Sequence, residues 1–155
     1  MSASLAQDEL LITRIFDAPA SLVFALWTDP EHFRRWMGPE DFDCPVAEMD
    51  LRVGGAYRGM IRSAQHGENW FGGTYREIEP NHRLVFTFAW DDGPSGEIET
   101  LVTITFTEQG GKTVQMFHQS PFSSVERRDS HVGGWTSAFE KAAAYAAQVS
   151  QEEKL

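Results

Sequence analysis

Hydrophobic residues alternate between strand-like and helical spacing along the chain. The run Leu10–Phe16 is rich in β-forming residues and ends at an Asp-Ala-Pro turn. Apolar residues then recur at helical spacing over Leu22–Trp27, after a start signal at Pro19 and Ser21, and a second short helix is predicted over Glu31–Trp36. The chain therefore begins with a predicted strand followed by two short helices.

After Pro39 the spacing changes to a period of two, which is typical of half-buried strands. Six strands are predicted, separated by turns rich in glycine, asparagine and aspartate: Asp41–Leu51, Gly55–Ser63, Trp70–Ile78, Arg83–Trp90, Glu97–Thr107 and Lys112–Gln119. Connections this short predict antiparallel hairpins, because a parallel crossover needs a dozen residues or more. The inward phase of the last strand stays open, because one phase holds Val114, Met116 and His118 and the other holds Gln115, Phe117 and Gln119.

The helical period returns in the C-terminal part of the chain. An apolar stripe runs from Val132 through Trp135 and Phe139 to Val149, and its middle is rich in alanine. Small residues let a helix lie close to a sheet, so a gap or pocket is expected near Trp135 and Phe139. Gly133 and its neighbour either permit a close approach or mark a break before the helix proper.

This order of elements predicts an α+β domain over residues 1–155, with a core at about 10–149. A curved seven-stranded antiparallel sheet would grip a long C-terminal helix, with two short helices after the first strand. Gly72 and Gly73 suggest a bulge or bend that lets the sheet curl. One helix cannot fill so large a sheet unless side chains or a ligand occupy its open end.

Composition and charge exclude several function classes. Acidic residues outnumber basic ones 23 to 13, and a formal charge of −10 makes nucleic acid and anionic membranes poor partners. No apolar run approaches the 18 or so residues of a membrane span, so we expect a cytoplasmic protein without membrane insertion. Cys44 is the single cysteine, and the acids beside it are expected to raise its pKa. No histidine spacing fits a metal site and no glycine pair fits a nucleotide loop, so no cofactor is predicted.

The candidate site residues are aromatic side chains near element ends and a few polar groups. Aromatic walls with sparse polar groups are typical of small-molecule sites, but the same residues also serve as core. The aromatic candidates are Trp36, Tyr57, Trp70, Trp90, Trp135 and Phe139. Arg58 and Glu77 are candidates for orienting a polar end of a ligand, with a cross-strand surface pair as the alternative. His118 is the histidine expected nearest the pocket mouth, as a structural group or an acid–base group.

Particular stretches, together with the element order, resemble the helix-grip superfamily of START-like (SRPBCC) domains. The matching stretches are Phe16-Asp17-Ala18-Pro19, Val23-Phe24, Trp27-Thr28-Asp29-Pro30, Trp36 with Gly38-Pro39, Asp50 with Arg52 and Gly54-Gly55, Gly73 with Glu77 and Pro80, and Gly134-Trp135. Within the superfamily the chain is most similar to bacterial homologues of the heat-shock-protein ATPase activator. The resemblance implies the helix-grip fold and, across the superfamily, binding of lipids, sterols and other apolar molecules.

Three functions follow from the pattern and the resemblance. The first is binding of a small, mainly hydrophobic ligand, such as a lipid, between the sheet and the C-terminal helix. The second is a co-chaperone-like domain that contacts a heat-shock ATPase in a stress response. The third is a cyclase or hydrolase in the same cavity, although no paired catalytic constellation is present, which disfavours an enzyme.

Overall fold

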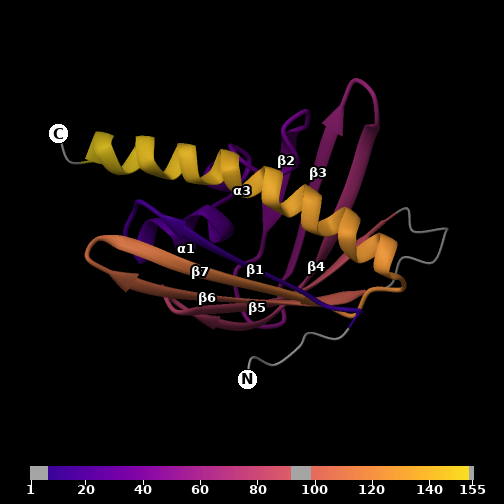
Figure 1. Cartoon of the computed structure of the whole chain (residues 1–155), viewed down its shortest axis with the longest axis horizontal. Coiled ribbons are helices and arrows are strands. Elements are labelled where there is room, and N and C mark those ends of the chain that lie inside the picture. Colours follow the sequence, from indigo (N-terminus) through magenta and orange to yellow (C-terminus); the bar gives the residue numbers. More distant parts are fainter. Residues whose placement is uncertain (1–6, 92–98, 154–155) are drawn as a thin grey trace.

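Within residues 7–91 and 99–153, which the computed structural model describes, seven strands form one antiparallel sheet. The strands are β1 (Leu10–Phe16), β2 (Asp43–Met49), β3 (Ala56–Ser63), β4 (Gly67–Glu79), β5 (Arg83–Trp90), β6 (Thr100–Gln109) and β7 (Lys112–Ser120). Their order across the sheet is β1-β7-β6-β5-β4-β3-β2. Two short helices, α1 (Ala20–Thr28) and α2 (Pro30–Phe33), follow β1, and the long helix α3 (Val125–Glu153) crosses one face of the curved sheet (Figure 1). The predicted α+β helix-grip architecture is confirmed.

The two short helices begin where backbone amides find acceptors. The amide of Ala20 donates to Glu108 Oε1 at 2.7 Å, which ties the start of α1 to β6. Asp29 ends α1 and caps α2, because its side chain accepts from the Glu31 amide and Pro30 occupies the first turn. The predicted second helix over Glu31–Trp36 is shorter than expected, since the chain turns after Phe33.

The strands lie where alternation predicts them, but most of them begin or end at other residues than predicted. β1 and β5 have the predicted bounds, whereas the strand predicted over Asp41–Leu51 is trimmed at both ends to β2. β4 begins at Gly67, ahead of the predicted Trp70, because the hairpin turn before it is tight and Gly67 has a φ of 67°. β6 begins at Thr100, while Glu97 of the predicted strand lies outside the described residues.

Gly72 and Gly73 let neighbouring backbones approach β4. A Cβ on Gly73 would lie 2.0 Å from the Thr87 carbonyl oxygen, and one on Gly72 would lie 2.7 Å from the Tyr57 carbonyl oxygen. The register shift of β4 against β5 comes later, between Tyr75 and Glu77. The glycines therefore serve close strand packing, and the bulge that was expected at them lies a few residues further along β4.

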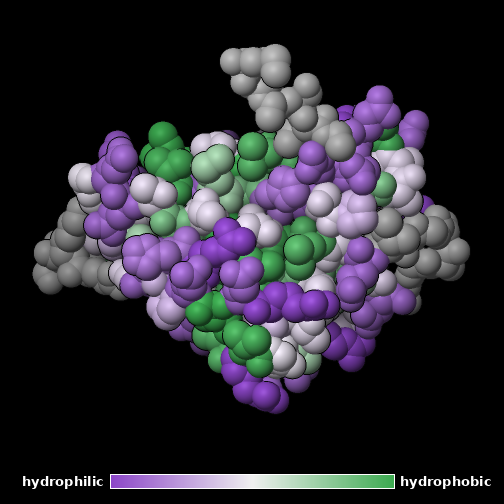
Figure 2. All heavy atoms as spheres, turned by 90° about the horizontal axis from the view of Figure 1, so that it is seen from below, coloured by the Kyte–Doolittle hydropathy of each residue, from purple (hydrophilic) through white to green (hydrophobic). Residues whose placement is uncertain are grey.

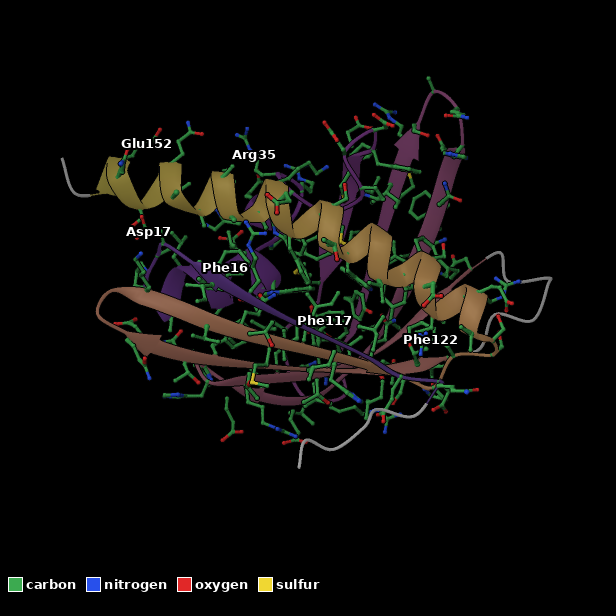
Figure 3. All side chains as sticks on the ribbon, viewed as in Figure 1. Phe16, Asp17, Arg35, Phe117, Phe122 and Glu152 are labelled. Carbon is green, nitrogen blue, oxygen red and sulfur yellow. The ribbon has the colours of Figure 1, made fainter. Side chains whose placement is uncertain are left out.

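The buried face of β7 is the phase that contains two glutamines, Gln115 and Gln119. Gln115, Phe117 and Gln119 are fully buried, whereas Val114 and His118 alternate with them on the outer phase. The reason is hydrogen bonding: Gln115 Oε1 accepts from the Trp27 indole at 2.8 Å, and Gln119 Nε2 donates to Thr100 Oγ1 at 2.8 Å. Figure 3 shows Phe117 between the sheet and α3.

Helix α3 is continuous from Val125 to Glu153, so Gly133 does not break it. Ala142 and Ala146 are buried, and the small side chains let the helix pack on α1 and β1. The predicted stripe is thus the buried face of a helix that starts earlier than predicted.

The outer face of the sheet is mixed in character. Figure 2 shows this face, where hydrophobic residues lie among polar ones. Exposed apolar side chains come from β1, β6 and β7, namely Leu11, Ile15, Leu101 and Met116. At one edge of the sheet, β2 contains Pro45 and has a register shift against β3 between Asp43 and Val46.

Among the described residues, no helix has the length and hydrophobicity needed to cross a membrane.

Candidate functional site

An open cavity of about 480 Å³ lies where the N-terminal half of α3 faces β3, β4 and β5. Its wall is mostly apolar with a few polar groups, and the described residues that line it are Met37, Gly38, Pro39, Phe42, Ile61, His66, Asn69, Trp70, Phe88, Trp90, Arg127, Ser130, His131, Gly134, Trp135 and Ala138. This volume is within the range of small-molecule sites. We call it the α3 cavity; Figure 1 shows the helix and strands that bound it.

The floor of the α3 cavity is the indole of Trp135. Its ring packs on Phe117 and Phe88, with centroids 4.7 and 5.8 Å away, and on Phe139 one turn further along α3. Trp135 Nε1 donates to Gln119 Oε1 at 2.8 Å. The indole is thus fixed by a buried hydrogen bond, and its position is set before any ligand enters.

Behind this floor the space between sheet and helix is filled by side chains. The void there measures only about 10 Å³, enough for a single water, and is lined by Trp27, Tyr57, Phe86 and other core residues. Among the described residues, the gap beneath the helix therefore lies at its N-terminal half. Aromatic packing closes the rest.

One wall of the α3 cavity is a hydrogen-bonded pair of rings. Trp90 Nε1 donates to His131 Nε2 at 3.1 Å, and His131 Nδ1 lies 2.8 Å from the Arg127 carbonyl oxygen. A carbonyl only accepts, so Nδ1 carries the proton, and an indole only donates, so Nε2 carries a lone pair. His131 is therefore held as the neutral Nδ1–H tautomer. Phe122 packs on the same ring, with a centroid distance of 4.9 Å, below the start of α3 (Figure 3).

Another part of the rim is the loop Pro39–Phe42, which is attached to α3 by hydrogen bonds. Lys141 Nζ donates to the carbonyl oxygens of Pro39 and Phe42 at 3.2 and 3.1 Å, and the Glu40 amide donates to Ser137 Oγ. Burial lowers the pKa of Lys141 from its ordinary value. The ring of Phe42 stacks on His66 at the mouth. The rim is thus anchored by backbone contacts.

Three predicted aromatic residues line the α3 cavity, and three lie in the core. Trp90 and Trp135 form its wall and floor. Trp70 also borders it, but the Trp70 ring lies on the outer phase of β4 beneath Arg58. Trp36 is 1% exposed and donates to the Leu26 carbonyl oxygen, and Phe139 is likewise closed off by neighbouring rings.

Tyr57 and the predicted polar residues lie outside the α3 cavity. The Tyr57 hydroxyl donates to the Thr87 carbonyl oxygen at 2.6 Å, and burial raises its pKa well above the ordinary value. Arg58 covers the Trp70 ring at 4.3 Å, on the outer phase of the sheet, and pairs with Asp91. It therefore faces away from the cavity.

The side chains of Glu77 and His118 pair with other side chains on the outside of the sheet. Glu77 accepts from Arg83 at 3.3 Å, a cross-strand pair of the kind given as the alternative. His118 Nε2 lies 2.7 Å from Glu9 Oε2 on the outer phase of β7. The strand alternation that buries Phe117 turns His118 away from the α3 cavity.

Cys44 is in an environment that lowers the reactivity of its thiol. Its thiol is buried, donates to the Val46 carbonyl oxygen at 3.3 Å and has a pKa raised to about 11. Burial is the main cause, with a smaller contribution from Asp43, so the neighbouring acids explain less of the shift than the sequence suggested. Within residues 7–91 and 99–153, no group of three or more His, Cys, Asp or Glu side chains could hold a metal ion.

Sequence reasoning missed Arg127, His131 and the Pro39–Phe42 rim. Arg127 and His131 are four residues apart and lie on one face of a helix, a spacing visible in the sequence. They precede the apolar stripe, however, which placed the expected helix start at Val132.

A curved seven-stranded sheet that grips one long helix, with a cavity at the N-terminal half of that helix, defines a helix-grip domain. Residues 17–147 match the family described as Activator of Hsp90 ATPase homolog 1-like protein, and the chain belongs to this family. The resemblance inferred from the sequence is confirmed. Fold and family together support a ligand-binding or ATPase-activator-like domain.

Solved bacterial structures have the same fold over nearly their whole length. A protein from Chromobacterium violaceum is 27% identical, with a TM-score of 0.84, over 92% of this chain and 99% of that one. The AHSA1 protein from Silicibacter pomeroyi is 24% identical, with a TM-score of 0.78, over 90% and 98%. A protein from Nitrosomonas europaea, 18% identical with a TM-score of 0.79 over 98% and 100%, is similar in fold. No curated protein matches the chain in sequence.

Proposed function

We propose that this protein binds a small, mainly hydrophobic molecule in the α3 cavity. The observation that carries the proposal is an open volume of about 480 Å³ with aromatic floor and walls, whereas the described core behind its floor leaves a void of only about 10 Å³. Trp135 and Trp90 are held by hydrogen bonds to Gln119 and His131, so the apolar surface is in place before binding. A ligand would then cause little ordering of side chains, which favours affinity.

The test uses two adjacent glycines of α3. Gly134 lines the α3 cavity, and a Cβ there would meet only Pro39 Cγ at 3.7 Å; a Cβ on Gly133 would meet nothing within 4 Å. Gly134→Leu should occupy part of the cavity, while Gly133→Leu makes the same chemical change outside it. Both remove a helix glycine and should stabilise α3 by roughly 0.5–1 kcal/mol.

Binding is measured by titrating the uncharged fluorophore N-phenyl-1-naphthylamine and following tryptophan emission. We expect saturable quenching in the wild type and in Gly133→Leu, and at least about tenfold weaker binding in Gly134→Leu, because the new side chain takes the ligand's volume. Equal binding by the two variants would place the ligand elsewhere. An absence of saturable binding across lipids, sterols and aromatic compounds would overturn the proposal.

The family description favours a second candidate, an interaction with an Hsp90-like ATPase. Its test is the ATP turnover of a bacterial Hsp90 homologue with increasing amounts of this protein. A raised rate supports this candidate, and a flat rate at excess protein removes it.

A further inference from the structure

Three side chains separate the α3 cavity from the small void behind its floor. Met37, Phe88 and Trp135 line both spaces, and we call these three side chains the partition. The cavity measures about 480 Å³ on one side of the partition, and the void measures about 10 Å³ on the other. The partition therefore sets the depth of the cavity, and with it the length of molecule that fits inside.

Two members of the partition are fixed by contacts of their rings. The Trp135 indole donates to Gln119 Oε1 at 2.8 Å, and the Phe88 ring stacks on Phe71 with a centroid distance of 5.3 Å. Met37 differs, because a methionine side chain has no ring and no hydrogen-bond donor, and it rotates about several bonds. Its thioether is the part of the partition that a substitution can remove without taking away a ring.

The backbone on both sides of Met37 is held in place. The Met37 amide donates to the carbonyl oxygen of Phe33, the last residue of α2, at 3.1 Å. The next residue, Gly38, has a φ of 98°, and a Cβ there would lie 3.0 Å from Phe42 Cβ and 3.1 Å from Ile61 Cγ2. We therefore expect a substitution at Met37 to change the partition and to leave the course of this loop unchanged.

The two sides of the partition differ in polarity. None of the described residues that line the void carries a charged side chain. The α3 cavity is also lined by His66, Asn69 and Ser130, and none of these three lines the void. A ligand in the cavity would therefore direct its apolar end toward Met37 and its polar end toward these groups.

Resting on the proposed function, we propose that Met37 limits the depth of the α3 cavity and thereby selects compact apolar ring compounds over compounds with a long alkyl chain. A ring that lies on Trp135 extends as far as the partition, so additional methylenes find no apolar space and stay in water. Burial of one methylene raises affinity about fourfold, whereas a methylene that stays in water adds little.

The uncharged ligands 4-propylphenol and 4-hexylphenol measure this depth, because they differ by three methylenes on the same ring. Each is titrated at neutral pH against bound N-phenyl-1-naphthylamine, whose loss of fluorescence reports displacement. We expect the wild type to bind the two phenols within about fourfold of each other. Met37→Ala removes the thioether, so it should bind 4-hexylphenol about tenfold or more tightly than 4-propylphenol, up to about 60-fold if all three methylenes are buried.

Met49→Ala is the matched variant. Met49 lines the void but not the α3 cavity, so the same chemical change enlarges the void and leaves the partition closed. We expect Met49→Ala to keep the wild-type ratio of the two affinities. Met37→Val, which shortens the side chain less, should raise the ratio by about fourfold and replaces Met37→Ala if that variant does not fold. Circular dichroism checks the fold of each variant.

Failure of this inference is distinguishable from failure of the proposed function. A wild-type preference for 4-hexylphenol of more than about tenfold would show that Met37 does not limit the depth, and equal ratios in the Met37 and Met49 variants would show the same. Either result overturns the inference and leaves cavity binding intact, as does binding of N-phenyl-1-naphthylamine that neither phenol displaces. If no compound binds, both proposals are overturned.

Discussion

Truncating Trp135 to alanine tests whether the floor of the α3 cavity is also part of the core. The side chain is 5% exposed, packs on Phe88, Phe117 and Phe139, and donates to Gln119. Removing it takes away ring contacts on the sheet side and the donor for a buried amide oxygen. On the other side the ring already borders open space, where fewer contacts are lost.

The lost ring contacts and the lost hydrogen bond set the expected decrease in the free energy of unfolding. Large-to-alanine truncation of a core aromatic costs roughly 3–5 kcal/mol. An unsatisfied Gln119 Oε1 would add about 1–3 kcal/mol, but truncation opens a path for water from the cavity, which offsets part of it. We therefore expect Trp135→Ala to lower the free energy of unfolding by about 3–5 kcal/mol. Trp135→Phe, which keeps the ring contacts and loses the hydrogen bond, should cost about 1–3 kcal/mol.

Urea denaturation followed by circular dichroism measures both losses, provided the m-value stays constant. Ligand titration of the same variants should show weaker binding for Trp135→Ala. A stability loss of only about 1–2 kcal/mol would mean that the ring is largely solvated and does not support the core. A full loss with unchanged ligand binding would instead remove Trp135 from the site.

Three further predictions concern the thiol, the glycines and the buried amides. Alkylation of Cys44 by iodoacetamide should be slow at neutral pH, and its rate should rise as the pH approaches the thiol pKa of about 11, because only the thiolate reacts. A rate at pH 7 equal to that of the urea-unfolded chain would contradict this. Gly73→Ala should lower the midpoint of urea unfolding, because its Cβ would lie 2.0 Å from the Thr87 carbonyl oxygen, and an unchanged midpoint would refute that close approach. Gln119→Leu should lower the free energy of unfolding by about 1 kcal/mol more than Gln115→Leu does. Gln119 makes two buried hydrogen bonds, whereas Gln115 Nε2 has no partner among the described residues. Equal losses in urea titrations would argue against this.

The fold could be predicted from the sequence because its signals are local. Hairpin turns separate strands with a period of two, and the stripe through Trp135 gives α3 its buried face. The inward phase of β7 could not be predicted, because it depends on partners far away in the chain. Trp27 reaches Gln115 across 88 residues, and hydrophobicity alone gives no reason to bury a glutamine.

The site was only partly predictable for a similar reason. Trp90 and Trp135 were expected near element ends, and both line the α3 cavity. Trp36 has the same kind of position in the sequence, yet it is core because the Leu26 carbonyl oxygen lies within reach of its indole. Arg58 belongs to a strand whose next residue, Gly59, faces the core, so the period of two places it outside.

Pro45 in the edge strand β2 has a consequence for how copies of this protein meet. An edge strand offers unpaired backbone groups on which a strand of another molecule can form a new ladder. Pro45 has no N–H to offer, and the register shift between Asp43 and Val46 bends the strand away from the straight geometry that such pairing needs. Strand addition at this edge would also bring together two chains that each carry a charge of −10. The backbone chemistry of β2 therefore disfavours aggregation through this edge of the sheet.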